Sequence, residues 1–348
     1  MDDSIISDLA KLTTRVDGSG MPQDLAVSIK TRVEQLKKMT SSPTFMPEFD
    51  RLMKYIDWCT KIPWNKKTQD NLDLTHASQV LEANHYGLAD VKNRILEYVS
   101  VLKLKKESGG ENAGRAPILC FVGLVGTGKT TIATSIGESL NRKFARIPFG
   151  GMGDPLDLRG QSRVHPESEP GKVIKALVGT QSENPVILLD EIDRVTDQGR
   201  SSIMGVLVEL LDPEQNHAFV DHYIDYPVDL SGALFIATAN NTHNIATAVM
   251  DRLEPIMMPS YTDNEKIVIG QKYMMPRLLA ESGIPAGALV IDESVWPQIV
   301  RPLGFDAGIR TLQRNIEGAV RKAARLLVEG KTQRVIINSE NIKEFLPQ

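Results

Sequence analysis

Cysteine is scarce in this sequence of 348 residues, which contains only Cys59 and Cys120. Two cysteines cannot build a disulfide framework, and so small a number is typical of a reducing compartment. The six histidines are scattered. His217 and His222 in HAFVDH are spaced too far apart to share one helical face, so we expect them to be structural and predict no metal site from histidine spacing.

Long apolar runs are also missing. A membrane-spanning helix needs roughly eighteen or more consecutive apolar residues, and the sequence has no such run. The first residues, MDDSIISDLAKL, carry acidic side chains where a secretory signal needs positive charge. These features predict a soluble protein, expected in the cytoplasm, with no membrane partner.

Neither sign of charge is in large excess. The formal net charge is −4 and the sequence pI is about 5.9. The densest basic runs, KLKKES and QLKKM, are short and typical of solvated helix faces. Proteins that bind nucleic acid usually carry a basic patch or stripe. The charge pattern therefore argues against nucleic acid as a partner.

The pattern of apolar residues and breakers predicts three sections. In residues 1–75 the pattern predicts a helical segment, in which VDGSGMP interrupts the first helix and Pro63 ends the last one. Residues 76–256 alternate strands with helices, the α/β pattern of a parallel sheet covered on both faces. Residues 257–348 predict a small helical domain in which RVIINS is a candidate strand. The strand candidates of the middle section are PILCFV, set off by the loop ESGGENAGRA, then FARIPF, PVILLD, ALFIATA and EPIMMP.

The stretch GLVGTGKT follows the pattern Gly-x-x-x-x-Gly-Lys-Thr between a strand candidate and a segment with helical spacing. A glycine-rich loop in this position directs backbone N–H groups at an anion. We therefore expect it to bind nucleotide phosphates, with Lys129 reaching the β- and γ-phosphates and Thr130 binding Mg²⁺. The predicted phosphate-binding residues are Gly123, Leu124, Val125, Gly126, Thr127, Gly128, Lys129, Thr130 and Thr131.

A pair of acidic residues follows the third strand candidate. PVILLDEID ends its apolar run in Asp190 and Glu191, at the carboxyl edge where an open α/β sheet binds its ligand. We expect Asp190 to hold the Mg²⁺ on which Thr130 also acts, and Glu191 to polarise a water for attack on the γ-phosphate. Positioning and charge neutralisation carry most of phosphoryl transfer, so these groups nearly suffice for hydrolysis.

Three more polar residues fit an oligomeric ATPase. Asn240 lies near the end of FIATANN and can orient the attacking water. Arg252 in VMDRLEPI precedes the last strand candidate, and Arg310 in FDAGIRTLQR lies near the start of a helix. An arginine supplied by a neighbouring subunit stabilises transition-state charge and makes hydrolysis depend on assembly. In this order after the phosphate loop and the acidic pair, the residues resemble those of AAA+ ATPases.

Longer motifs narrow this resemblance. From about Met46 to the C-terminus the chain strongly resembles the ATPase module of Lon proteases, and LLDPEQN is the most specific motif. The resemblance implies a AAA+ fold with a five-stranded parallel sheet and a small helical lid, together with Mg-ATP, protein substrates and a hexameric ring. It also implies that Asn240 is sensor 1, Arg252 a trans-acting arginine finger and Arg310 sensor 2, with His85, Tyr86 and Gly87 near the adenine. The motifs are YIDWCTKIPWNKKT, NHYGLADVKNRILEY, NRKFARIPFGGM, NPVILLDEIDR, ELLDPEQNHAFVDHYIDYPVDLSGALFIATAN, MDRLEPI, YTDNEK and GIRTLQRNIE.

The sequence also departs from the family. Leu124 and Val125 replace two prolines that usually stiffen the phosphate loop, a change expected to alter function little. The position of the tyrosine that grips substrate in Lon proteases falls on His165, and a second pore position falls near Asp197. Neither offers the same large apolar contact. The peptidase domain of the full enzyme would begin where this sequence stops, at NIKEFLPQ, so we expect no peptidase active site in this chain.

Two hypotheses of different class follow. The first is a Lon-type AAA+ ATPase that unfolds or threads protein substrates, with a separately encoded protease as a further partner. The second is a nucleotide-controlled assembly or adaptor protein, or an excised ATPase module of an ATP-dependent serine protease. The complete set Glu191, Asn240, Arg252 and Arg310 favours hydrolysis, whereas the altered pore positions favour the second hypothesis.

Overall fold

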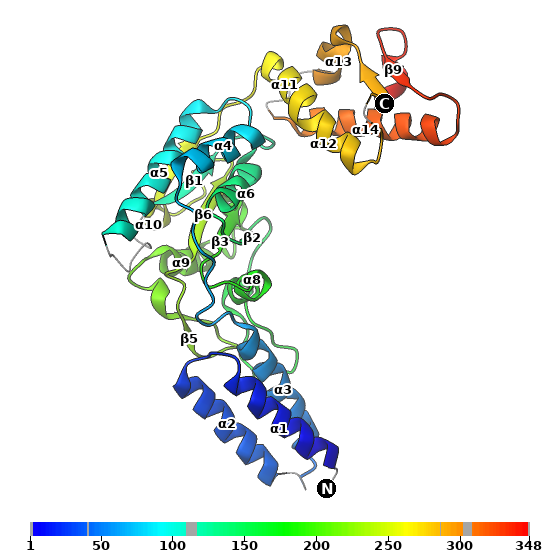
Figure 1. Ribbon diagram of the computed structural model, residues 1–348. Helices are drawn as coiled ribbons and strands as arrows, with labels where there is room; N and C mark the ends of the chain where they lie inside the picture. The colour runs from blue at the N-terminus through cyan, green and yellow to red at the C-terminus, as the bar shows by residue number, and fades with distance from the viewer. Residues whose placement is uncertain (1–2, 40–41, 109–116, 286, 302–307, 347–348) are drawn as a thin grey trace.

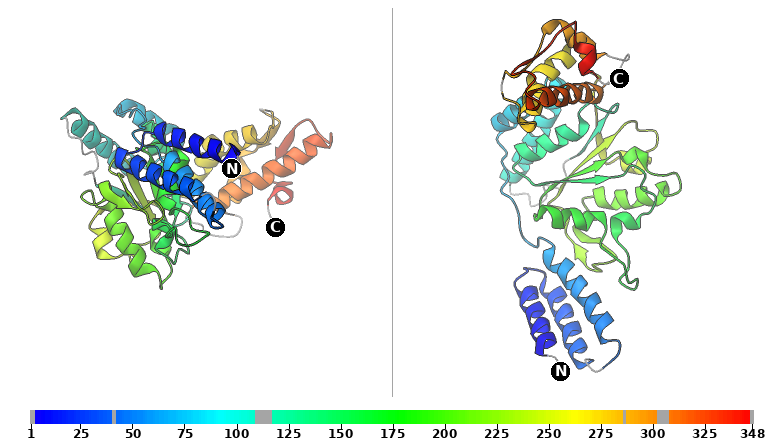
Figure 2. Two further views of the ribbon diagram at one scale, coloured as in Figure 1. Left: turned by 90° about the horizontal axis from the view of Figure 1, so that it is seen from below. Right: turned by 90° about the vertical axis from the view of Figure 1, so that its right-hand side faces the viewer.

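The computed structural model describes residues 3–39, 42–108, 117–285, 287–301 and 308–346. Three units follow one another along the molecule, and the N-terminal and C-terminal units lie at opposite ends in Figure 1 and in the right-hand view of Figure 2. The N-terminal unit comprises helices α1 to α3, the central unit runs from α4 to β7, and the C-terminal unit runs from α11 to α15.

Three helices form the N-terminal unit, as the sequence predicts. Helix α2 buries Leu25, Ile29, Val33 and Leu36, whose spacing of three or four residues places them on one face. Helix α3 stops where Ile62 turns to extended backbone before Pro63, because proline disfavours the helical conformation of the residue before it. The helices are α1 (Asp3–Asp17), α2 (Gln23–Lys38) and α3 (Phe45–Lys61).

A five-stranded parallel sheet forms the centre of the molecule, in the order β2-β3-β6-β1-β7. All five predicted strands are present, and the predicted α/β class is confirmed. The loop expected from Glu107 to Ala116 lies almost wholly outside the described residues. The strands are β1 (Ile118–Val122), β2 (Phe144–Pro148), β3 (Val186–Asp190), β6 (Leu234–Ala239) and β7 (Leu253–Met257).

Helices cover both faces of this sheet. On one face, Ile132 of α6 and Ile95 of α5 pack with Phe121 and Leu188 of the strands. On the other face, α8 and α9 share a buried cluster with Cys120 and Leu189, and this cluster also includes the buried residues of α1 to α3. The helices of the central unit are α4 (Leu74–Asn84), α5 (Ala89–Glu107), α6 (Lys129–Ser139), α7 (Leu156–Arg159), α8 (Lys172–Thr180), α9 (Arg200–Leu211) and α10 (Thr247–Met250).

The predicted division at residues 75/76 and 256/257 stays a prediction. Helix α4 begins at Leu74 and strand β7 ends at Met257, so each predicted boundary falls just inside an element. The N-terminal and central units share one continuous buried cluster, which periodicity along the chain does not reveal.

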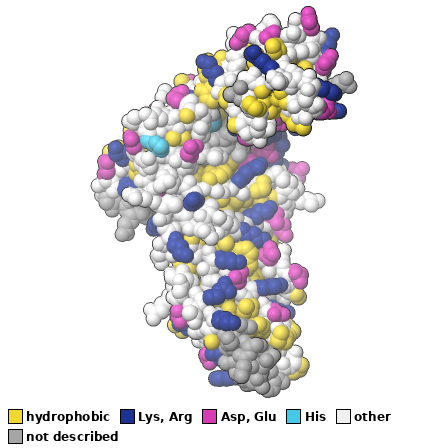
Figure 3. Space-filling model, turned by 45° about the vertical axis from the view of Figure 1, so that its right-hand side comes forward, with side chains coloured by type: hydrophobic (Ala, Val, Ile, Leu, Met, Phe, Trp, Pro, Cys, Tyr) yellow, Lys and Arg dark blue, Asp and Glu magenta, His cyan; other side chains and the backbone are white. Residues whose placement is uncertain are grey.

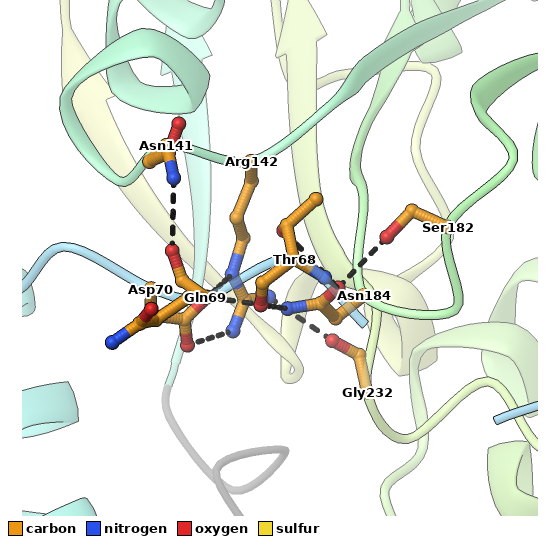
Figure 4. Close-up of polar contacts among 8 residues, drawn as sticks. All are labelled: Thr68, Gln69, Asp70, Asn141, Arg142, Ser182, Asn184 and Gly232. Carbon is orange, nitrogen blue, oxygen red and sulfur yellow. Dashed lines mark hydrogen bonds and ion pairs between the residues drawn. The ribbon is translucent and has the colours of Figure 1, made fainter. Parts of the chain in front are cut away.

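The connector between α3 and α4 is bound across the central unit by polar contacts (Figure 4). Arg142 donates to both carboxylate oxygens of Asp70, at 2.8 Å each, and to the carbonyl of Gly232 at 3.0 Å. Asn184 accepts from the backbone N–H of Thr68 at 2.8 Å and donates to the carbonyl of Thr68 at 3.0 Å. The connector is therefore attached to the sheet through its backbone as well as its side chains.

The C-terminal unit is helical, as predicted, with a small parallel strand pair. RVIINS forms β9 as predicted, but its partner β8 was not predicted. The segment 263–281 contains a π-helical turn, η4 (Gly270–Met274), ahead of Pro276. A Cβ on Gly270 would lie 2.5 Å from the Trp296 ring, so the close packing of this turn requires glycine. The other elements are α11 (Asp263–Ile269), α12 (Met275–Glu281), β8 (Leu289–Ile291), α13 (Trp296–Val300), α14 (Arg310–Val328), β9 (Val335–Ile337) and α15 (Ile342–Phe345).

Shorter elements complete the chain. Strands β4 (Phe219–Val220) and β5 (Pro227–Val228) form a small antiparallel pair that was not predicted. Single turns occur at η2 (Ile192–Arg194), η3 (Asn216–Ala218) and η5 (Glu293–Val295). Among the described helices, none has the length and apolar character needed to cross a bilayer.

Charged side chains of both signs share the face drawn in Figure 3, where Lys and Arg lie among Asp and Glu over the N-terminal unit. Arg15 pairs with Asp57 at 2.8 Å, and Arg51 pairs with Glu48 at 3.0 Å. Exposed pairs of this kind add little to stability. They do, however, place acidic charge beside basic charge on the N-terminal unit.

Candidate nucleotide-binding site

The predicted phosphate loop connects β1 to α6, and its glycines are required by its geometry. Gly126 and Gly128 have φ angles of 85° and 93°, in the left-handed region that favours glycine. A Cβ on Gly123 would lie 2.7 Å from the carbonyl oxygen of Met258. Because the loop leads directly into the N-terminus of α6, its backbone N–H groups and the helix dipole favour a bound anion.

The two residues that replace the family prolines differ in position: Leu124 is exposed, whereas Val125 is half-buried and lines the cleft beside the loop. The Leu124 side chain is 54% exposed. The turn is held instead by the buried Thr127, whose hydroxyl donates to the carbonyl of Leu124 at 2.9 Å. This internal hydrogen bond supports the expectation that the loop keeps its shape without proline.

Lys129 is the buried cation of the site. Its Nζ donates to the carbonyls of Gly123 at 2.6 Å and Leu124 at 3.0 Å, and to Oδ1 of Asn240 at 3.2 Å. Burial lowers the pKa of the Lys129 ammonium, while the nearby carboxylates of Asp190 and Glu191 act in the opposite direction. The acidic pair thus favours the charged form of Lys129, which is the form that would bind phosphate.

Asp190 ends strand β3, and both of its carboxylate oxygens are engaged. Oδ1 accepts a hydrogen bond from the hydroxyl of Thr238, on the neighbouring strand β6. Oδ2 accepts from Nε of Arg146 at 2.7 Å and from its Nη2 at 2.6 Å. The carboxylate is therefore held in a fixed orientation at the carboxyl edge of the sheet, as predicted from its place in the sequence.

Glu191 adopts a left-handed backbone with φ 60° and ψ 50°, which is uncommon for a residue with a side chain. Its backbone N–H donates to Thr238 Oγ1 at 2.9 Å, and its carbonyl accepts from the N–H of Arg194 at 2.9 Å. These bonds hold the strained turn. The turn reverses the chain directly after Asp190, so the two acidic side chains do not follow the regular alternation of a strand.

Arg310 approaches the phosphate loop from the C-terminal unit. The N–H of Ile309 donates to the carbonyl of Gly126 at 3.0 Å. A Cβ on Gly126 would lie 3.3 Å from Cγ of Arg310, so the start of α14 packs directly on the loop. The two units therefore meet at the place where the sequence predicts the phosphates.

These residues line a cleft of about 140 Å³ between the central and C-terminal units. Two observations fit a nucleotide with Mg²⁺: the donor set suits phosphate and the cation, and Nδ2 of Asn240 is buried without a partner among the described residues. Sequence analysis did not predict Ile309 or Gln313 at this cleft. The lining residues are Val125, Gly126, Gly128, Lys129, Thr130, Thr131, Asp190, Glu191, Ile309, Arg310 and Gln313.

The residues expected near the adenine lie beside the phosphate loop, between α4 and α5. His85 is buried, and its Nε2 lies 2.9 Å from the hydroxyl of Ser135 on α6. Burial, followed by the ammonium of Lys92, lowers the pKa of His85 to about 4. Gly87 has φ 65°, and the Tyr86 ring meets the Tyr273 ring edge-on at 6.3 Å. The structure places His85 against α6 and places Tyr86 and Gly87 beside the C-terminal unit. The role of all three in binding adenine stays a prediction.

Arg252 does not line this cleft. Its guanidinium donates to Asp212 at 2.8 Å and to the carbonyl of Ala248 at 2.8 Å, and its side chain is 28% exposed. Asp212 belongs to LLDPEQN, so the most specific family motif holds this arginine in place. A position away from the chain's own phosphate loop is compatible with the expected action on a neighbouring copy.

The loop 160–171 carries His165, which is exposed at its tip. The backbone of His222 fixes one end of this loop, and Asp221, a fully buried carboxylate, fixes the other. Asp221 accepts from the N–H of Gly171 at 2.7 Å, Tyr223 at 2.8 Å and Ile224 at 3.1 Å, and the N–H of His222 donates to the carbonyl of Arg159 at 2.6 Å. Arg163, near the tip, stacks over the Tyr55 ring of α3 at 4.0 Å. The other residue expected at a pore position, Asp197, is 89% exposed and pairs with Arg200.

Two site residues escaped the sequence analysis. Thr238 contacts both acidic residues, and Arg146 pairs with Asp190. Thr238 stands two positions before Asn240 in FIATANN, and Arg146 lies within FARIPF. Both residues lie in predicted strands. Their positions beside Asp190 could be predicted only by knowing which strands are neighbours in the sheet.

Comparison with known proteins agrees with this geometry. Residues 119–261 match the family model of ATPases associated with various cellular activities (AAA), and residues 280–336 match the Lon protease AAA+ ATPase lid domain. The Lon protease of Bacillus thuringiensis is 38% identical over 97% of this chain and 42% of its own length. That of Lawsonia intracellularis is 40% identical over 97% of this chain and 40% of its length, and Lon protease 2 of Thermus thermophilus is 41% identical over 93% and 41%.

The parallel sheet, the phosphate loop and the family match define a P-loop ATPase fold of the AAA+ class. Within that class the chain belongs to the Lon family, as its AAA+ ATPase module with the Lon-type lid. The chain spans about two-fifths of the length of the curated relatives compared above. The C-terminal unit is called the lid from here on.

Proposed function

We propose that this chain binds ATP with Mg²⁺ and hydrolyses it. The observation that carries the proposal is the convergence of Lys129, Thr130, Asp190, Glu191 and Arg310 on one cleft between the central unit and the lid. These residues come from three separate parts of the sequence. A cation, a hydroxyl, two carboxylates and a second cation are the groups that phosphoryl transfer requires.

Each residue has a separate task in this proposal. The loop N–H groups and Lys129 bind the phosphates, while Thr130 and Asp190 hold the cation. When bound, Mg²⁺ supplies neutralising charge for the phosphate oxygens. Glu191 accepts a proton from the attacking water, which Asn240 orients, and Arg310 stabilises negative charge from the lid side. The strained turn at Glu191 and its bond to Thr238 support a fixed position for this base.

Two substitutions test the proposal directly. Lys129→Ala should abolish binding of a fluorescent ATP analogue, because the buried ammonium is the main partner of the phosphates. Glu191→Gln should keep binding but reduce phosphate release by about a hundredfold or more. Lys143→Ala, at an exposed lysine just before β2, serves as the control and should behave like the wild type. Wild-type turnover by Glu191→Gln would show that another group is the base.

We further propose that the chain acts on protein substrates as a ring, with six copies as the expected number. Arg252 supports this assembly, since it lies away from the cleft of its own chain and is partly exposed. The relatives compared above are named proteases, but the matched region covers only about two-fifths of their length. For this chain we therefore propose only the ATPase part.

A nucleotide-controlled assembly or adaptor role is the second candidate. One observation favours it: the exposed pore positions carry His165 and Asp197 in place of large apolar side chains. Both candidates predict ATP binding and hydrolysis. They differ in whether the ring pulls on a substrate, which is tested by the unfolding experiment described in the Discussion.

A further inference from the structure

The ion pair between Arg146 and Asp190 lies within the proposed Mg²⁺ site. Nε and Nη2 of Arg146 lie 2.7 and 2.6 Å from the same oxygen, Oδ2 of Asp190. The other oxygen, Oδ1, accepts the Thr238 hydroxyl. Both oxygens of the proposed metal ligand are thus occupied by protein donors. Any cation that binds Asp190 through Oδ2 must displace the guanidinium.

Strand register explains how this arginine reaches the site. Arg146 of β2 is paired with Leu188 of β3, two residues before Asp190. Side chains two residues apart point to the same face, so Arg146 and Asp190 lie on one side of adjacent strands. Leu188 packs with Ile132 of α6, which identifies this side as the one that carries the phosphate loop.

The two partners differ in exposure. The Asp190 side chain is 5% exposed, whereas the Arg146 side chain is 52% exposed. A buried carboxylate needs a cationic or hydrogen-bonding partner, because desolvation of an uncompensated charge is costly. The guanidinium can move into solvent with little penalty, but the carboxylate cannot. The pair is therefore built so that Asp190 stays in place and exchanges one cation for another.

We propose that Arg146 is a positioning residue that competes with Mg²⁺ for Asp190 and sets the Mg²⁺ concentration at which the site is loaded. This inference rests on the proposed function, since it takes Asp190 to be the Mg²⁺ ligand. Without the metal, Arg146 compensates the aspartate and keeps its carboxylate oriented. When Mg²⁺ binds, the guanidinium leaves Oδ2 and swings to the exposed edge of β2.

A Mg²⁺ titration of the full chain with a fluorescent ADP analogue tests this role, read as nucleotide binding rather than turnover. In Arg146→Gln the competing charge is gone, so the Mg²⁺ midpoint should fall about threefold or more, the order of one exposed ion pair. Arg146→Lys keeps the charge but cannot donate to Oδ2 from two nitrogens, so its midpoint should lie between those of Arg146→Gln and wild type. Lys143→Gln removes an exposed cation before the same strand and should leave the midpoint unchanged.

A second readout separates competition from a purely structural role. In the absence of Mg²⁺ and nucleotide, Arg146→Gln should lower the thermal unfolding midpoint, and saturating Mg-ADP should reduce the difference from wild type. An unchanged or raised Mg²⁺ midpoint in Arg146→Gln, with ADP binding intact, would overturn the inference. If the wild type binds no nucleotide at any Mg²⁺ concentration, the proposed function itself fails. An Arg146→Lys midpoint below that of Arg146→Gln would also overturn the inference.

Discussion

His85 is a buried histidine whose neutral form is favoured by its surroundings. Burial and the Lys92 ammonium lower its pKa to about 4, and Lys92 donates to the carbonyl of His85 at 2.6 Å. In the unfolded chain the pKa of histidine is about 6.5. Between these values the unfolded chain binds a proton that the folded chain does not. The contribution of His85 to stability is therefore complete above pH 6.5 and is lost as the pH falls towards 4.

We predict that stability falls by about 2 kcal/mol between pH 7 and pH 5 because of this residue. Urea unfolding at the two pH values should show the fall in wild type, and His85→Gln should remove most of it. The exposed His243→Gln is the matched control and should keep the wild-type difference. An equal pH dependence in wild type and His85→Gln would contradict the prediction.

The connector between α3 and α4 depends on one largely buried ion pair. The side chains of Arg142 and Asp70 are 8% and 15% exposed, and the guanidinium binds both carboxylate oxygens. Removing one partner leaves a largely buried charge without compensation, a loss of about 3–5 kcal/mol. We expect Arg142→Met to lower stability by an amount of this order and to expose residues 62–73 to protease.

Thermal unfolding and limited proteolysis measure the two effects. Arg94→Met provides the comparison, because Arg94 is 59% exposed and lies 3.7 Å from Glu254. It should change the free energy of unfolding by less than about 1 kcal/mol. If Arg142→Met were as stable and as protease-resistant as Arg94→Met, the connector would be held by its backbone contacts alone.

Local patterns predicted the central elements well. Each strand of the main sheet is a short apolar run bounded by breakers, and the glycine loop before α6 is recognisable without any tertiary information. The position of Asp190 at the carboxyl edge follows from the same pattern. Strand β8 was missed because three residues, Leu289–Ile291, are too few to establish a period.

Other features depend on contacts between distant segments and could not be read from the sequence. Thr238 and Arg146 reach Asp190 only because β6 and β2 flank β3. The π-helical turn before Pro276 depends on the packing of Gly270 against Trp296. The shared core of the N-terminal and central units likewise arises from tertiary packing, which overrides a division based on helix and strand patterns.

At the scale of the whole molecule, the position of Arg252 leads to a prediction about how copies of the chain assemble. If it acts on the nucleotide of a neighbouring copy, ATPase activity should rise more steeply than linearly with protein concentration. Arg252→Ala and Lys129→Ala chains should each be inactive, and mixing them should restore part of the activity, because some interfaces then contain an intact cleft and an intact arginine. Phosphate release across a range of mixing ratios measures this.

Arg252→Ala also removes the ion pair with Asp212, so the effect of losing that pair needs a separate control. Asp212→Asn weakens the same ion pair but leaves the arginine in place, so it should keep activity at high protein concentration. Strict linearity with concentration, together with no rescue on mixing, would rule out a trans role for Arg252.

The two exposed residues expected at pore positions, His165 and Asp197, can distinguish a threading enzyme from an assembly switch. A large aromatic side chain buries about 150–250 Å² against a passing chain, which neither His165 nor Asp197 can match. We predict that wild type hydrolyses ATP but unfolds a stably folded model substrate weakly or not at all. His165→Tyr should increase the stimulation of ATPase activity by an unfolded peptide.

Loss of substrate fluorescence and peptide-stimulated phosphate release are the measurements. Val164→Tyr places the same ring one residue away, at another exposed position, and serves as the control. Strong unfolding by wild type that persists in His165→Ala would show that the substrate is gripped elsewhere, and the ATPase proposal would be unaffected.

The buried Asp221 carboxylate has a mechanical consequence for the loop that carries His165. It accepts a hydrogen bond from the N–H of Gly171, which fixes one end of the loop. The hydrogen bond from the N–H of His222 to the Arg159 carbonyl fixes the other end. A Cβ on Gly160 would lie 2.8 Å from the same carboxylate, so the backbone is closely packed at this end of the loop as well. With both ends held, and with Arg163 stacked on Tyr55, the loop is fixed both to the central unit and to α3. A rotation of the central unit would therefore carry His165 with it.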